Sequence, residues 1–143
     1  MDRTQTRIVN RLEEIRRVAA MVERFGQEHR VPAQVVNDVN VALDEVLSNI
    51  VSYAYDSGAR SEILVRLAYR PSEMHVDVED AGRPFDPLQA PPPDLGASLQ
   101  ARPVGGLGIH VIKSLMDEVV YARVDGKNRL HLRKKLPASD GNR

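Results

Sequence analysis

Two polar side chains, Glu45 and Asn49, stand four residues apart in a stretch with the apolar spacing of a helix. Residues four apart are neighbours on a helix surface, so both side chains can reach one small site. An asparagine oxygen is a hard, neutral ligand that suits Mg²⁺, which usually keeps waters and phosphate oxygens in its shell. A glutamate beside it can accept the proton of a hydroxyl that attacks a phosphate. The alternative is a solvated helix flank, the commoner use of such residues.

A second group, residues 78–87, reads Val-Glu-Asp-Ala-Gly-Arg-Pro-Phe-Asp-Pro and comes at the end of a strand-like run. Asp80 at this strand end can accept a hydrogen bond from the exocyclic amine of a base. Gly82 would let the backbone approach the base closely, and Pro84 stiffens the turn. The alternative is an ordinary turn that carries Phe85 as a core residue.

The third group is the glycine-rich run Gly105, Gly106, Leu107, Gly108 and Ile109, which opens a predicted helix. Backbone N–H groups at such a helix start form a cradle for an anion. The spacing is neither that of a P-loop nor that of the strand-led dinucleotide fingerprint. A tight packing joint between loop and helix is the alternative. Each group is weak alone, but the three together predict a nucleotide site.

Changes in apolar periodicity indicate the elements that must position these groups. Helical spacing predicts three helices, over residues 8–27, from Pro32 to about residue 56, and over residues 105–116. Alternating spacing predicts a short strand near residues 4–9 and two hairpins, formed by residues 63–69 with 74–78 and by residues 119–124 with 130–136. Helices grouped around consecutive antiparallel strands predict an α+β fold, a two-layer sandwich in which about three helices cover a mostly antiparallel sheet.

Residues 87–104 include three consecutive prolines, a composition that favours neither a regular helix nor a central strand. We expect a long loop that acts as a lid over the nucleotide, because long loops in compact domains are often functional. Arg102 in this loop and Lys113 after it could add positive charge near a phosphate. Residues 137–143 are expected to form a disordered tail.

Composition narrows the classes of function. At 143 residues the chain suits one domain, residues 1–143. Its 20 Lys and Arg balance 20 Asp and Glu, so no general basic field exists to hold a nucleic-acid backbone. The absence of cysteine excludes disulfides and thiolate metal sites. The N-terminus has no apolar secretory segment and no run is long enough to span a bilayer, so we expect a soluble, cytoplasmic protein without direct nucleic-acid or membrane binding.

The order and content of the three groups resemble the GHKL, or Bergerat-fold, ATPases, and within them the small bacterial anti-sigma-factor serine kinases of the RsbW and SpoIIAB type. Residues 42–49 resemble the family's N box, residues 79–87 its first glycine box and residues 106–109 its second. Residues 115–119 also resemble the stretch that follows the second glycine box. The resemblance covers nearly the whole chain.

The resemblance implies ATP and Mg²⁺ as cofactors and a role for each group. Asn49 would hold Mg²⁺, Asp80 would bind the adenine amine, and Glu45 would be the catalytic general base. The remaining nucleotide-binding residues would come from the two glycine boxes, namely Gly82, Pro84, Phe85, Gly105, Gly106, Leu107, Gly108 and Ile109.

By the same resemblance the chain would be a protein serine/threonine kinase that acts as an anti-sigma factor. It would phosphorylate an anti-anti-sigma antagonist of the STAS type and sequester a sigma factor or a similar regulator, and it could form a homodimer. One alternative is a non-catalytic switch that binds a protein partner with an affinity that depends on ATP. A structural adaptor without nucleotide would require all three groups to be incidental.

Overall fold

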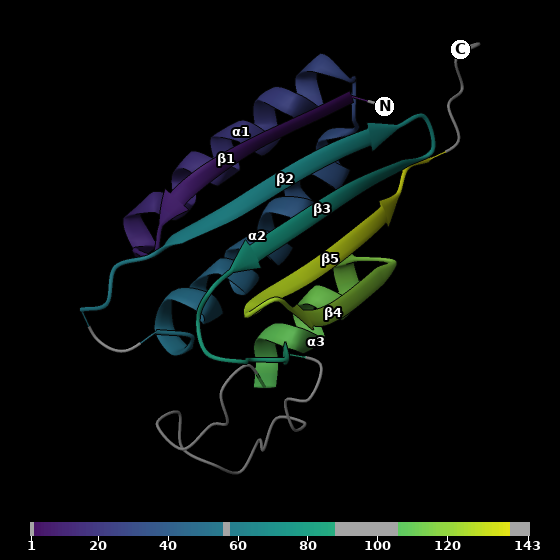
Figure 1. The fold of residues 1–143 in the computed structure, drawn as a ribbon. Coiled ribbons are helices and arrows are strands. Elements are labelled where there is room, and N and C mark those ends of the chain that lie inside the picture. The colour runs from purple at the N-terminus through teal and green to yellow at the C-terminus, as the bar shows by residue number, and fades with distance from the viewer. Residues whose placement is uncertain (1, 56–57, 88–105, 138–143) are drawn as a thin grey trace.

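A computed structural model describes residues 2–55, 58–87 and 106–137. Five antiparallel strands form one sheet in the order β1-β2-β3-β5-β4. The helices of the described residues pack on one face of this sheet, and Figure 1 looks onto the opposite face, with α1 and α2 behind the strands. The predicted α+β two-layer fold is therefore confirmed.

The elements follow one another as β1 (Asp2–Val9), a 3₁₀ turn (Leu12–Glu14), α1 (Ile15–Glu28), α2 (Ala33–Tyr53), β2 (Glu62–Arg70), β3 (Glu73–Asp80), α3 (Gly106–Leu115), β4 (Glu118–Val124) and β5 (Lys127–Lys135). No helix among these described residues is long and apolar enough to cross a membrane.

The first strand is longer than the sequence predicts, and the first helix begins later. Ile8 was assigned to a helix starting at that residue, but it pairs with Ile63 in the β1–β2 ladder and is buried. Its place in the core follows the strand alternation with Thr4 and Thr6, which is hard to separate from helical spacing over so few residues. Leu12, which the helical pattern also included, is 59% exposed.

The second helix, α2, carries the N-box residues and packs along the sheet. Its apolar stripe includes Val39, Leu43, Val46 and Ile50, all buried. This burial fixes the rotation of the helix, so that the neighbouring positions on its flank face α3.

The closing hairpin is tighter than predicted. Only Asp125 and Gly126 connect β4 to β5, and both have positive φ, 52° and 77°. This is the backbone that a two-residue hairpin with a primed turn requires. Lys127 and Asn128, which precede the predicted start of the last strand at residue 130, therefore belong to β5, and Asn128 lies opposite Asp80 in the β3–β5 ladder.

The predicted lid, residues 87–104, falls almost entirely outside the described residues. Pro87 is described, whereas residues 88–105, including Arg102 and Gly105, are not, and neither are residues 138–143 of the predicted tail. The third helix begins at Gly106, one residue after the predicted start.

Candidate functional site

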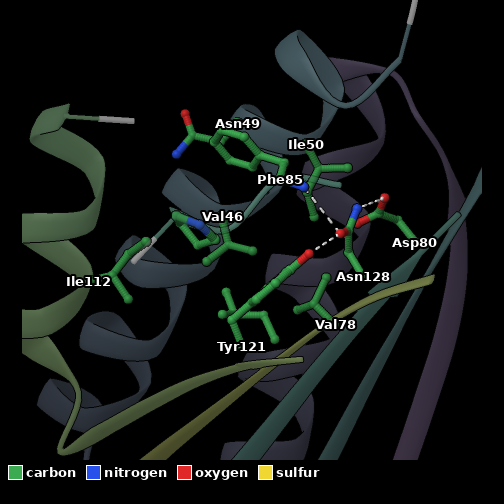
Figure 2. A pocket seen from close by; sticks show the side chains of 11 residues that line it. Val46, Asn49, Ile50, Val78, Asp80, Phe85, Ile112, Tyr121 and Asn128 are labelled. Carbon is green, nitrogen blue, oxygen red and sulfur yellow. Dashed lines mark hydrogen bonds between the residues drawn. The ribbon is translucent and has the colours of Figure 1, made fainter. Parts of the chain in front are cut away.

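A narrow pocket lies between α2, α3 and the sheet, at the end of the fold where β3 leads into the loop that follows Asp80 (Figure 2). The residues that line it are Val46, Asn49, Ile50, Val78, Asp80, Phe85, Pro87, Ile112, Tyr121, Asn128 and Leu130. Most of these side chains are apolar, and the few polar groups converge from different elements. A largely apolar pocket with a few placed polar groups is typical of small-molecule sites.

Asp80 is the buried carboxylate of this pocket, with only 3% of its surface exposed. Its Oδ1 accepts hydrogen bonds from the Gly82 N–H at 2.8 Å and from Asn128 Nδ2 at 3.1 Å. Burial raises the pKa of the Asp80 carboxyl, and these two hydrogen bonds only partly oppose that rise. Both bonds end on Oδ1, and the buried Tyr55 hydroxyl lies near the same carboxyl. Each carboxylate oxygen has two lone pairs, so Oδ2 keeps the capacity to accept from a ligand amine.

Asn128 connects the parts of the site and was missed by the sequence analysis. Its Nδ2 donates to Asp80 Oδ1 and to the Arg83 carbonyl oxygen at 2.8 Å. Its Oδ1 accepts from the Tyr121 hydroxyl and from the Phe85 N–H at 3.2 Å. The dashed lines of Figure 2 show the contacts of Asn128 with Asp80, Tyr121 and Phe85. The buried amide of Asn128 therefore uses all of its donor and acceptor sites, and its bonds connect β3, β4, β5 and the loop.

Gly82 lies where no side chain fits. A Cβ at this position would come 2.5 Å from the Ala54 carbonyl oxygen and 2.8 Å from the Ala54 Cβ. The next residue, Arg83, donates its N–H to the same carbonyl oxygen at 2.9 Å, while Arg123 donates to the Gly82 carbonyl at 2.8 Å. The close approach that this glycine permits is thus between the loop and the end of α2, which sets the height of the loop over the pocket.

Glu45 and Asn49 meet the second glycine box at the other end of the pocket. A Cβ on Gly108 would lie 3.0 Å from Glu45 Oε2 and 3.1 Å from Asn49 Nδ2. The first turns of α3 therefore rest on the polar flank of α2, and the absent side chain makes the contact possible. Two of the three sequence groups are brought together here.

Asn49 offers groups that fit a metal-bound phosphate. Its Nδ2 is buried and has no hydrogen-bond partner among the described residues, so it can donate to a phosphate oxygen. Its Oδ1 and the Glu45 carboxylate are oxygen donors of the kind that Mg²⁺ prefers. The described residues hold no cluster of three or more His, Cys, Asp or Glu suited to a metal. A Mg²⁺ ion here would therefore take most of its ligands from phosphate and water, as Mg²⁺ commonly does.

The pocket is contracted. Its free volume is about 20 Å³, room for a water molecule and much less than a nucleotide base needs. Phe85 is half-buried on the loop side, and its ring centroid lies 6.4 Å from that of the exposed Tyr53. Binding of a base therefore requires a wider pocket, and Phe85 is the largest described side chain on its loop side.

The other predicted residues have different settings. Pro84 is exposed on the loop, and Ile109 is buried in the core beside α2. Gly106 and Leu107 form the first turn of α3. Lys113 is exposed in the last turn of this helix. Of the predicted residues, Asn49, Asp80 and Phe85 line the pocket, while Glu45 and Gly108 lie together at its α2–α3 side.

The signal that could have found Asn128 was the turn. An Asp-Gly dipeptide between two alternating runs favours a two-residue hairpin loop, which would have placed Asn128 in β5. Tyr121 gave no comparable signal, because alternation shows which face of β4 it occupies but not that its hydroxyl reaches Asn128.

Comparison with known proteins gives the site its context. The model of the histidine kinase-like ATPase domain family matches residues 8–134. The chain is 32% identical over 111 residues to the serine/threonine-protein kinase BtrW of Bordetella bronchiseptica, and the match covers 78% of each protein. It is 30% identical over 90 residues to the serine-protein kinase RsbW of Listeria monocytogenes, covering 60% of this chain and 57% of that protein.

Solved structures show the same fold. The chain superposes on the structure of the RsbU and RsbW domains of Rv1364c from Mycobacterium tuberculosis with a TM-score of 0.69 and 17% identity, over 96% of this chain and 34% of that one. A mycobacterial sensor histidine kinase, MprB, gives a TM-score of 0.51 at 17% identity, over 92% of this chain and 98% of that one. The resemblance drawn from the three sequence groups is confirmed. The chain belongs to the histidine kinase-like ATPase domain family, among the protein serine/threonine kinases related to BtrW and RsbW.

Proposed function

We propose that this protein is an ATP- and Mg²⁺-dependent serine/threonine kinase that phosphorylates a small antagonist protein and sequesters a sigma factor or a similar regulator. The observation that carries the proposal is that Asp80 and Asn49 line one pocket, and that Asn49 and its neighbour Glu45 both lie beside Gly108 of α3. Family membership supplies the use of ATP.

In this proposal each group has a separate task. Asp80 Oδ2 accepts from the adenine amine, and the apolar walls hold the ring. The backbone at the start of α3 binds phosphate oxygens, because free N–H groups of a helix start favour anions. Asn49 would hold Mg²⁺, which would neutralise charge on the phosphates.

Glu45 would be the general base. It accepts the proton of the substrate serine hydroxyl while that oxygen bonds to the γ-phosphorus, and the bond from the γ-phosphorus to the ADP oxygen breaks. The products are phosphoserine and ADP, with the proton on Glu45. General-base help of this kind contributes roughly 10²–10⁴ in rate.

The proposal for the protein partners rests on the relatives of this chain. The names of RsbW and BtrW describe protein kinases, and their likeness to this chain supports a protein substrate. We propose an anti-anti-sigma protein of the STAS type as the substrate and a sigma factor as the sequestered partner, in the cytoplasm, with this chain as one ATPase domain covered by a lid at residues 87–104. A homodimer is part of the same proposal.

Phosphotransfer tests the catalytic part directly. The wild type and Glu45→Ala are incubated with γ-labelled ATP, Mg²⁺ and small proteins of the source cell, and ATP binding is measured in parallel. The proposal predicts a labelled protein with the wild type, about 10²-fold or more slower labelling with Glu45→Ala, and ATP binding by both. ATP binding without any labelled protein would favour the non-catalytic switch, and equal labelling rates would remove Glu45 as the base.

A further inference from the structure

The outer face of the sheet, opposite the helices, carries a second hollow that the nucleotide site does not use. Its volume is about 520 Å³, and it lies over β1, β2 and β3 near the end of the sheet where β2 and β3 are joined. Ala68 of β2 is one of the residues that line it. The small side chain of an alanine among longer neighbours leaves the space open.

Strand register explains which side chains surround Ala68. Arg3 lies directly opposite it on β1, and His75 lies directly opposite it on β3. Arg66 and Arg70 are two residues away on either side along β2 and so point to the same face. Three guanidinium groups and the His75 imidazole therefore surround Ala68, and Asp77 and His131 complete the lining on the β3–β5 side.

The three arginines have no carboxylate partner among the described residues. Arg66 donates from Nε to the neutral Gln5 side chain at 3.3 Å, and neither Arg3 nor Arg70 forms an ion pair within the described ranges. All three are exposed. Their positive charge is available to a ligand.

The nearest carboxylates are already engaged. Asp77 accepts from His131 Nδ1 at 2.8 Å, and Glu73 contacts His75 Nε2 at 2.9 Å and Arg133 at 3.3 Å. Asp77 also lies opposite Arg66 in the β2–β3 ladder and lines the hollow, so the lining carries three arginines and one carboxylate.

The arginines on β5, in contrast to those around Ala68, form ion pairs with carboxylates. Arg129 pairs with Glu79 at 2.9 Å, and Arg133 pairs with Glu73 and Glu118, each at 3.3 Å. One half of the outer face is thus neutralised by ion pairs, while the half over β1 and β2 keeps a local positive charge in a chain whose net charge is zero.

We propose that this hollow over Ala68 is a docking site for an acidic segment of a partner protein. Arg66 and Arg70 are about 13 Å apart along β2, which is the length of about four extended residues. Carboxylates of such a segment would pair with the guanidinium groups, which form paired hydrogen bonds with carboxylates. A nucleic-acid backbone fits less well, because it would run on from this small patch over Glu73, Asp77 and Glu79.

The site lies on the opposite face of the sheet from the nucleotide pocket. A segment bound there does not cover the pocket, so it does not block access by ATP or by a substrate serine. The docking site therefore adds to the proposed kinase function and does not depend on phosphotransfer.

The test uses the full chain labelled with ¹⁵N and titrated with a short peptide of alternating glutamate and glycine, followed by NMR amide shifts. We expect shifts centred on Arg3, Ala68 and His75. The variant Arg66→Glu with Arg70→Glu should weaken binding by about tenfold or more, since two charges that attract the peptide become two charges that repel it. The matched control, Arg16→Glu with Arg24→Glu, makes the same charge change at exposed positions of α1 and should bind within about twofold of wild type.

A second variant tests whether binding needs the shape of the hollow or only its positive charge. Ala68→Leu keeps every charge but fills part of the hollow, and it should weaken peptide binding while leaving the ATP affinity unchanged. Equal binding by Ala68→Leu and wild type would overturn the proposed site. Tighter binding of duplex DNA than of the peptide at the same residues would overturn it in favour of nucleic acid. The absence of shifts would leave the arginines as charges that protect the edge strand β1 from pairing with other chains.

Discussion

Asn128 on β5 lies opposite Asp80 on β3 and donates a hydrogen bond from its Nδ2 to Asp80 Oδ1 at 3.1 Å. The same amide holds the Phe85 N–H and the Arg83 carbonyl of the loop that follows Asp80. The carboxylate is therefore aimed by a neighbouring strand, and the loop over the pocket is anchored to the same side chain.

Replacement of Asn128 by alanine should loosen both the carboxylate and the loop. Buried groups left without a partner cost about 1–3 kcal/mol each, so we expect the free energy of unfolding of Asn128→Ala to fall by at least about 1–3 kcal/mol. ATP affinity should fall as well. Chemical denaturation and ATP titration measure the two effects.

The neighbouring Arg129→Ala serves as the control, because Arg129 makes only an exposed ion pair with Glu79, a kind of contact worth about 0–1 kcal/mol. Equal loss of stability in the two variants would show that the buried network around Asn128 is unimportant.

Asp80→Asn should raise the stability of the fold at pH 7 and weaken ATP binding. Burial raises the pKa of the Asp80 carboxyl above its ordinary value of 3.8, so the folded protein binds this proton more tightly than the unfolded chain does. The stability that protonation contributes is fully present below the unfolded pKa and is lost as the pH rises through the higher folded pKa. The neutral asparagine escapes this loss.

We therefore expect Asp80→Asn to unfold at higher denaturant concentration than the wild type at pH 7, with the advantage shrinking as the pH falls towards 4, and to bind ATP more weakly. Denaturation curves across this pH range provide the measurement. A variant that is less stable than the wild type by the same amount at every pH would contradict the assigned cost of the buried charge.

Much of this arrangement could be predicted from the sequence, and the failures have physical reasons. The periodicity of α2 and the alternation in β2 and β3 placed Glu45, Asn49 and Asp80 on the correct elements, because burial of one face controls those patterns. The Asp125-Gly126 turn could have placed Asn128 in β5, but the contacts of Asn128 could not be predicted, since its partners come from β3, β4 and the loop. The predicted helix start at Ile8 was wrong because a strand and a helix can both bury one residue of a short segment.

Gly108→Ala should lower the phosphotransfer rate without lowering the stability of the fold. The methyl group of Gly108→Ala would press on Glu45 Oε2 and Asn49 Nδ2, which are ends of side chains and can yield. Alanine also favours a helix over glycine by up to about 1 kcal/mol. We expect unchanged or greater stability and a phosphotransfer rate lower by about tenfold or more, since small displacements of catalytic groups are costly.

Rate and thermal unfolding should be compared with Ser114→Ala, which alters the exposed side of the same helix. A normal rate in Gly108→Ala would mean that the contact between α3 and the two polar residues has no part in transfer.

Gly82→Ala should instead damage the fold. Its Cβ would collide with the Ala54 carbonyl oxygen, which is backbone and cannot turn aside. Overpacking of this kind costs about 1–3 kcal/mol, and the forced shift would also disturb the Gly82 N–H bond to Asp80. Denaturation of this variant beside Ala81→Ser, at an exposed position, measures the effect, and wild-type stability in Gly82→Ala would argue against the close packing of loop and helix.

The most direct measurement compares the affinities of the wild type for ATP and for inosine triphosphate, which has a carbonyl oxygen where adenine has its amine. If Asp80 Oδ2 accepts from that amine, ATP should bind at least about tenfold more tightly, because a hydrogen bond to a charged group contributes about 1.5–3 kcal/mol. Asp80→Asn should lose most of this preference. Equal affinities of the wild type for the two nucleotides would contradict the assignment of Asp80 as the adenine-binding residue.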